Sequence, residues 1–211
     1  MQRIAIGLSF TDSGYIGKPY WPELNVVINV MKDVHKKLGE AKKAAAILAS
    51  AAKQGYTREQ YAEIVKLSQR PFYTMNGSDS EIIIPERVFQ SFLNNTSQEA
   101  PKAVPRIASK GLTFIGVKVQ DGYLRSGKTA ADALRFERFV KNDESNQRMF
   151  VSDQYIIGFQ ATGIIRLDEE VIKSEELKKL VEYGGRLYGI GSARPQGYGR
   201  FTVSRWEKLS T

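Results

Sequence analysis

Hydrophobic and polar positions alternate at the start of the chain, where Ile4, Ile6, Leu8 and Phe10 are separated by polar or small residues. This period of two predicts a strand with one buried face. Strands are expected along the rest of the chain as well. Four further apolar or alternating runs predict them, at residues 81–85, 112–119, 155–167 and 199–206.

A second pattern, with apolar residues three or four apart, predicts helices in the first third of the chain. It covers residues 22–38, where Ile28 and Met31 are expected on the apolar stripe, and residues 40–54. Thr57 and Gln60 have the spacing of a capping box, which predicts the start of a third, short helix. Together these helices make residues 22–69 one helical segment.

Two more helices are expected, each after a predicted strand. The first covers residues 86–94 and is followed by a polar loop at 95–109. The second begins at Ser174, which we expect to be its N-cap, and ends at Gly184 and Gly185, which we expect to form its C-cap.

The segment before the 155–167 strand is rich in charge and predicts a β-hairpin over about 133–151, pairing 133–140 with 147–151. Alternation places Arg135 on one face of this hairpin and Arg138 on the other. Two interpretations stay open. The hairpin is either a solvated charged surface or a finger that grips nucleic acid.

The order of these elements predicts the fold class. Strands and helices follow one another in a way that favours an α+β fold, with a ferredoxin-like or RRM-like antiparallel sheet and helices on one face. We expect residues 1–211 to form a single domain that carries an inserted helical segment at about 22–69.

Composition narrows the chemistry. The chain has no cysteine and one histidine, which excludes disulfides, thiolate nucleophiles and clusters of Cys or His around a metal, so we expect no cofactor. No apolar run is long enough to span a membrane, and the N-terminus lacks a signal-peptide pattern, so we expect a cytoplasmic protein without a membrane partner. Lysine and arginine number 31 against 23 aspartate and glutamate, a net charge of +8 that points to an anionic partner such as nucleic acid.

The strongest local signal lies between the last predicted helix and the last strand. Glycines allow positive φ and close approach of another chain, while two arginines and exposed backbone N–H groups suit phosphate oxygens. Tyr198 is placed to stack on a base. The alternative is a tight helix-to-strand connection in which glycines serve packing. The candidate binding residues here are Gly189, Gly191, Arg194, Gly197, Tyr198, Gly199 and Arg200.

This segment reads G-x-G-x-x-R-x-x-G-x-G-R-F, and with its flanking elements at 155–206 it resembles the RAMP (repeat-associated mysterious protein) superfamily. Residues 83–93 resemble, more weakly, an element of the family's backbone subunits. The resemblance implies a ferredoxin-like fold, an RNA ligand, and a role in CRISPR-type antiviral ribonucleoproteins or in a phage or mobile element. It implies other RAMP subunits or copies of the same chain as partners. It also assigns the motif glycines and Arg194 and Arg200 to the RNA site.

His35 is the only histidine, and RAMP processing nucleases often use a histidine on an early helix as a general acid or base. A near-neutral pKa suits proton transfer at a ribose 2′-hydroxyl. Against this role, His35 falls on the apolar stripe of the helix predicted at 22–38, where a packed histidine is expected. A metal-independent endoribonuclease is therefore the first alternative function.

Residues 122–129 match the phosphate-binding pattern G-x-x-x-x-G-K-[ST], and Lys128 and Thr129 occupy its last two positions. A P-loop should directly follow a buried parallel strand and open a helix, and polar residues intervene here. A nucleotide hydrolase is the second alternative. As a plain basic turn, the segment still offers Arg125 and Lys128 to phosphate.

These observations favour a binding protein over an enzyme. We expect the chain to hold RNA or another single-stranded nucleic acid through its backbone, with weak sequence preference, inside a ribonucleoprotein.

Overall fold

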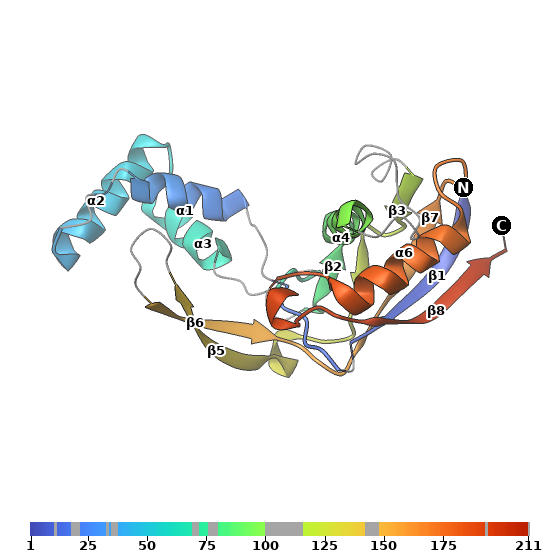
Figure 1. Ribbon diagram of the computed structural model, residues 1–211. Coiled ribbons are helices and arrows are strands. Elements are labelled where there is room, and N and C mark those ends of the chain that lie inside the picture. Colours follow the sequence, from blue (N-terminus) through green and yellow to red (C-terminus); the bar gives the residue numbers. More distant parts are fainter. Residues whose placement is uncertain are drawn as a thin grey trace. The chain divides into compact units, whose positions relative to one another are not determined.

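A computed structural model describes residues 1–10, 12–17, 22–32, 34, 38–68, 72–75, 80–99, 116–141, 148–192 and 194–210 (Figure 1). Contacts divide the chain into two compact units, one made of residues 1–18 and 71–211 and the other of residues 19–70. Each unit has its own cluster of buried hydrophobic side chains.

The smaller unit contains three helices, α1 (Pro22–Lys32), α2 (Glu40–Lys53) and α3 (Arg58–Ser68). Gly55, with φ of 85°, follows the end of α2 in a conformation that favours glycine. The predicted capping box is confirmed, since the amides of Thr57 and Gln60 each donate to the other's side chain, at 2.8 and 3.2 Å.

The first helix is shorter than predicted. It was expected to reach Leu38, but α1 ends at Lys32. Gly39 is extended, with φ of −62° and ψ of 156°, and serves as the N-cap of α2, so the chain must leave the helix before this point. His35 lies outside the described residues.

The larger unit is built on an antiparallel sheet with strand order β2-β4-β7-β1-β8, to which β3 is added through β7. Strand β1 (Gln2–Ser9) lies between β7 (Gln160–Leu167) and β8 (Thr202–Leu209). The short strands extend the sheet beyond β7; they are β2 (Ile83–Pro85), β3 (Val117–Val119) and β4 (Tyr123–Arg125).

Two helices, α4 (Glu86–Glu99) and α6 (Ser174–Leu187), cover one face of this sheet (Figure 1). The predicted strand β1 is confirmed, and Ile4, Ile6 and Leu8 are buried in the same cluster as the apolar side chains of both helices. The single buried face expected from the alternation is wrong, because Ala5 and Gly7 on the other face are buried too. The α+β, ferredoxin-like fold class predicted from the element order is the observed one.

Both helices run further than the sequence indicated. The loop expected at 95–109 is wrong for residues 95–99, which continue α4 and bury Thr96 and Ser97; residues 100–115 are not described. Gly184 and Gly185 lie inside α6 and do not cap it. A Cβ at Gly184 would come within 2.7 Å of the Phe92 ring on α4, and one at Gly185 within 2.7 Å of the Phe201 carbonyl. These glycines serve close packing.

The cap at the other end of α6 also differs from the prediction. Lys173 occupies the N-cap position, and Ser174 is the first helical residue. The Ser174 hydroxyl is buried and accepts a hydrogen bond from the Trp206 indole at 3.2 Å. The serine therefore ties the helix to the sheet.

The predicted hairpin is present as β5 (Leu134–Lys141) paired with β6 (Arg148–Tyr155). The single strand expected at 155–167 is wrong, because β6 ends at Tyr155 and β7 begins at Gln160. Gly158, with φ of 67°, lies in the break between them. The last strand starts at Thr202, three residues later than Gly199, where it was expected to begin.

Candidate nucleic-acid interface

The glycine-rich segment forms a closed loop between α6 and β8. Gly189, Gly191, Gly197 and Gly199 all have positive φ, at 74°, 90°, 89° and 78°. A side chain costs energy in this conformation, so the backbone path of the loop requires glycine at these four positions.

Three of these glycines also make room for neighbouring backbone. A Cβ at Gly199 would overlap the carbonyl oxygen of Ile190, and one at Gly189 would lie 2.7 Å from the carbonyl carbon of Gly199. At Gly191, a Cβ would lie 2.7 Å from the carbonyl oxygen of Ile16. A Cβ at Gly197 would meet nothing within 4 Å, so φ alone restricts that position.

The loop is fastened to the segment that follows β1. The amides of Gly199 and Ser192 donate to the carbonyls of Gly14 and Ile16, both at 2.8 Å. The Ser13 hydroxyl donates to the Gly197 carbonyl at 2.6 Å and accepts from the Arg200 amide at 3.2 Å. Several backbone donors expected to face phosphate are therefore used inside the protein, and the side chains of the loop must supply most contacts to an anion.

The two loop arginines are presented differently. Arg200 is exposed, and its backbone is held by Ser13. Arg194 opens a short 3-10 turn, Arg194–Gln196, and is half-buried. Within the described residues, neither guanidinium forms an ion pair. As far as the described residues go, both charges are available to an external anion.

Tyr198 packs beside Tyr155, the last residue of the hairpin. The ring centroids are 5.5 Å apart with the planes at 70°, an edge-to-face contact. Both rings are half-buried, and Gly14 leaves them space, since a Cβ there would lie 3.2 Å from the Tyr198 ring. The glycine-rich loop and the base of the hairpin therefore meet at an aromatic pair.

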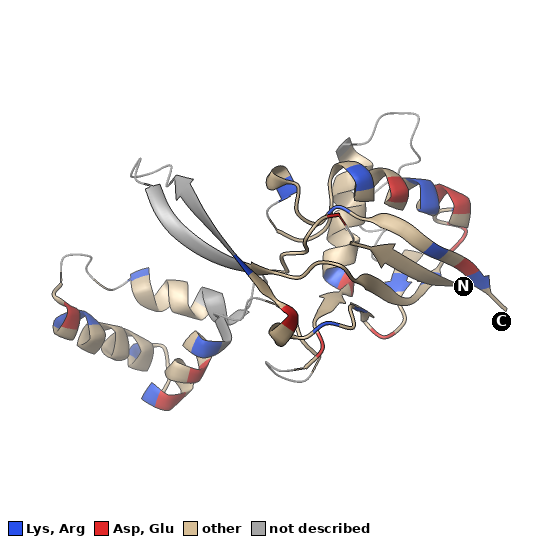
Figure 2. Cartoon of the chain, turned by 90° about the horizontal axis from the view of Figure 1, so that it is seen from below, with Lys and Arg blue, Asp and Glu red and all other residues tan. Residues whose placement is uncertain are grey.

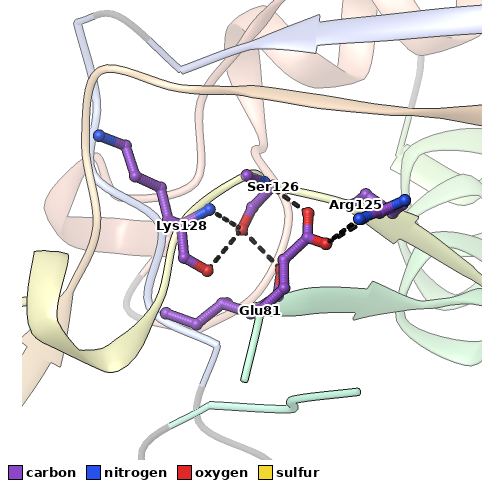
Figure 3. Close-up of polar contacts among 6 residues, drawn as sticks. Glu81, Arg125, Ser126 and Lys128 are labelled. Atoms are coloured by element: carbon purple, nitrogen blue, oxygen red, sulfur yellow. Dashed lines mark hydrogen bonds and ion pairs between the residues drawn. The ribbon is translucent and has the colours of Figure 1, made fainter. Parts of the chain in front are cut away.

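The segment 122–129 already binds a carboxylate of the protein itself, that of Glu81 (Figure 3). The Glu81 carboxylate accepts from the Gly127 amide at 2.7 Å and from the Arg125 guanidinium at 2.8 Å. Partial burial would raise the Glu81 pKa, but the hydrogen bonds from Arg125 and Gly127 outweigh it and lower that pKa below its ordinary value. Arg125 is consequently paired, whereas the Lys128 side chain extends away from Glu81 (Figure 3).

The structural context of a P-loop is missing. The strand before this loop, β4, is three residues long and pairs antiparallel with β2 and β7. Thr129 caps a 3-10 turn, Ala130–Asp132, by hydrogen bonds to the Asp132 carboxylate that lower the Asp132 pKa. Among the described residues, no α-helix directly follows Thr129 whose N-terminus could receive phosphate. The nucleotide-hydrolase alternative is therefore not supported.

ATP binding provides a direct check. We expect the wild-type protein to show no magnesium-dependent ATP binding in calorimetry, because Glu81 already occupies the amide of Gly127. Lys128→Ala should then leave the calorimetric signal unchanged. Tight binding in the wild type that disappears in this variant would restore the P-loop interpretation.

The remaining candidates lie on the hairpin. Arg135 is exposed and faces Gln154 across the strand pair, while Arg138 faces Val151. The side chain of Arg138 is outside the described residues. Figure 2 shows where lysine and arginine lie among the acidic residues in the described part of the chain. Among the described residues, no group of three or more His, Asp or Glu is arranged to hold a metal ion.

Comparisons with known proteins bear on this geometry. No family model and no curated protein matches the chain. A solved structure does, a cryo-EM structure of the Type III-B Cmr-beta bound to cognate target RNA, at a TM-score of 0.50 and 8% identity. The two chains share a fold. The similarity covers 99% of this chain and 61% of that chain, so this chain spans less than two thirds of its neighbour's length.

At this level of identity the likeness concerns the fold, and it agrees with the ferredoxin-like architecture expected from the RAMP resemblance. None of the described helices is long and apolar enough to cross a membrane.

Sequence reasoning missed Tyr155 and Glu81, because the contacts that matter join residues 43 or more positions apart.

Proposed function

We propose that this protein binds single-stranded RNA as a subunit of a RAMP-type ribonucleoprotein, without cleaving it. The observation that carries the proposal is a pair of arginines, Arg194 and Arg200, that have no ion-pair partner among the described residues. They lie on a loop that turns through positive-φ glycines and is held by hydrogen bonds to residues 13–16. A rigid loop loses little conformational entropy when it binds, so its charges are well suited to a phosphate chain.

Other features support the same ligand. The net charge is +8. The aromatic pair of Tyr155 and Tyr198 lies beside the loop and offers ring surface to unpaired bases. Lys128, and Arg135 and Arg138 on the hairpin, would extend the contacts, whereas Arg125 contributes less because Glu81 neutralises it. The structural neighbour belongs to an assembly bound to RNA. Further RAMP subunits, or copies of this chain, are the proposed protein partners.

Salt dependence tests this proposal. The affinity of the purified protein for a fluorescein-labelled poly(U) RNA should fall steeply as salt rises, with a log–log slope of about −0.7 for each phosphate contacted. Anisotropy titrations at several salt concentrations measure the slope, and gel electrophoresis of the recovered RNA should show it intact. An affinity independent of salt, or absent at low salt, would contradict RNA-backbone binding.

A further inference from the structure

A groove of about 680 Å³ lies beside the glycine-rich loop, and none of its α6 residues belongs to the candidate interface described above. One wall is the exposed side of α6, and the other is the start of β8 with residues 12 and 13 after β1. The volume is within the range of pockets that hold small molecules, roughly 300–1,000 Å³.

Three cationic side chains line this groove: Lys179 and Arg186 from α6, and Arg200 from the loop. Lys179 and Arg186 are seven residues apart, so they share a helix face with a separation of about 10 Å along the axis. All three are exposed, and none forms an ion pair with another described residue. The groove therefore presents positive charge from both walls.

Apolar and acidic groups complete the lining. Phe201 is buried and Tyr183 is half-buried, which gives the groove ring surface next to its cations. Two carboxylates also line it. Glu182 is paired with Lys178 at 3.9 Å, and Asp12 is exposed. Phosphate suits the cations, an aromatic base suits the rings, and the hydroxyl or amino groups of a nucleotide suit the carboxylates.

We infer that this groove holds one unpaired nucleotide of the bound RNA, with its flanking phosphates at Lys179, Arg186 and Arg200 and its base against Tyr183. The inference rests on the proposed RNA-binding function and extends it from the glycine-rich loop along α6. Arg200 belongs to both surfaces, so the RNA chain passes from one to the other without a gap in positive charge.

The test compares two double variants that remove the same charge. Lys179→Ala with Arg186→Ala should weaken binding of labelled poly(U) about 25-fold at 0.1 M salt and flatten the salt slope by about 1.4, as expected for two phosphate contacts. The control, Lys66→Ala with Lys208→Ala, removes two exposed lysines that already have glutamate partners. Its affinity should stay within about threefold of wild type.

Tyr183 is tested by a second pair of variants. Tyr183→Phe keeps the ring and should bind like wild type, whereas Tyr183→Leu should bind at least about fivefold more weakly, because base stacking is lost. Thermal unfolding of each variant checks that the protein is folded. Ultraviolet crosslinking of wild type to an RNA that contains 4-thiouridine, followed by peptide mapping, should identify residues 178–186.

The outcomes separate this inference from the function on which it rests. If wild type binds RNA but the α6 double variant matches its control, or if no crosslink falls within 178–186, the groove does not hold the RNA and the proposed function stands. If wild type fails to bind RNA at low salt, the proposed function itself is overturned, and this inference with it.

Discussion

Gly199→Ala is expected to destabilise the protein far more than Gly197→Ala, although the two positions have nearly the same backbone conformation, with φ of 78° and 89°. At Gly197 a Cβ meets nothing within 4 Å. The substitution there should cost only the strain of a left-handed alanine, about 1–2 kcal/mol. At Gly199 the same strain is joined by overlap with the Ile190 carbonyl oxygen.

Relief of that overlap requires the loop to open, which breaks the 2.8 Å hydrogen bond from the Ile190 amide to the Gly199 carbonyl. Overpacking and the lost bond should bring the total to about 3–6 kcal/mol. Urea unfolding of both variants measures the difference, and Tm should fall by roughly 10 °C or more for Gly199→Ala. Equal losses of stability in the two variants would contradict the close packing of Gly199 against the Ile190 carbonyl.

The second large effect is expected on RNA affinity. Arg194→Ala combined with Arg200→Ala should weaken binding of single-stranded RNA by about 25-fold at 0.1 M salt, because each arginine contacts about one phosphate and contributes about 0.7 to the salt slope. The loss should be similar for RNAs of different sequence, since phosphate contacts carry no base information. Anisotropy titrations with several homopolymers measure both quantities.

Stability should separate the arginines from the glycines of the same loop. The double arginine variant is expected to unfold at nearly the wild-type temperature, because the described residues provide no ion pair for either side chain. Lys66→Ala with Lys208→Ala again serves as the charge-matched control. Unchanged RNA affinity in a folded arginine variant would mean that the loop is a structural connection and that RNA binds elsewhere.

Local patterns predicted most of the elements because each depends on neighbours in the sequence. The alternation in β1 and the capping box at Thr57 fall in this group. The buried face of α1 was not predicted correctly. Ile28 and Met31 were expected on the apolar stripe but are 42% and 37% exposed, while Val30 is buried. The choice between these faces depends on where α2 and α3 pack, which the sequence of α1 does not contain.

The candidate site divides in the same way. The motif glycines and arginines were visible because they are close together in the sequence. The partners that give them meaning are distant, as with Ser13 and Gly14, which hold the loop from the other end of the chain. Glu81 changed the interpretation of Arg125 for this reason. The sequence pattern indicated a basic turn, but a carboxylate 44 residues away neutralises Arg125.

The position of β1 has a consequence for the order in which the protein folds. This strand is synthesised well before its pairing partners, β7 and β8, as in the pairs of Ile4 with Ile165 and with Lys208. Such pairing gives the sheet a high contact order, which slows folding. During translation, α1 to α3 depend on local contacts and should form early, whereas β1 keeps its apolar face and both edges uncovered until β7 and β8 have been synthesised. The nascent chain is therefore a natural client for chaperones that shield exposed strands.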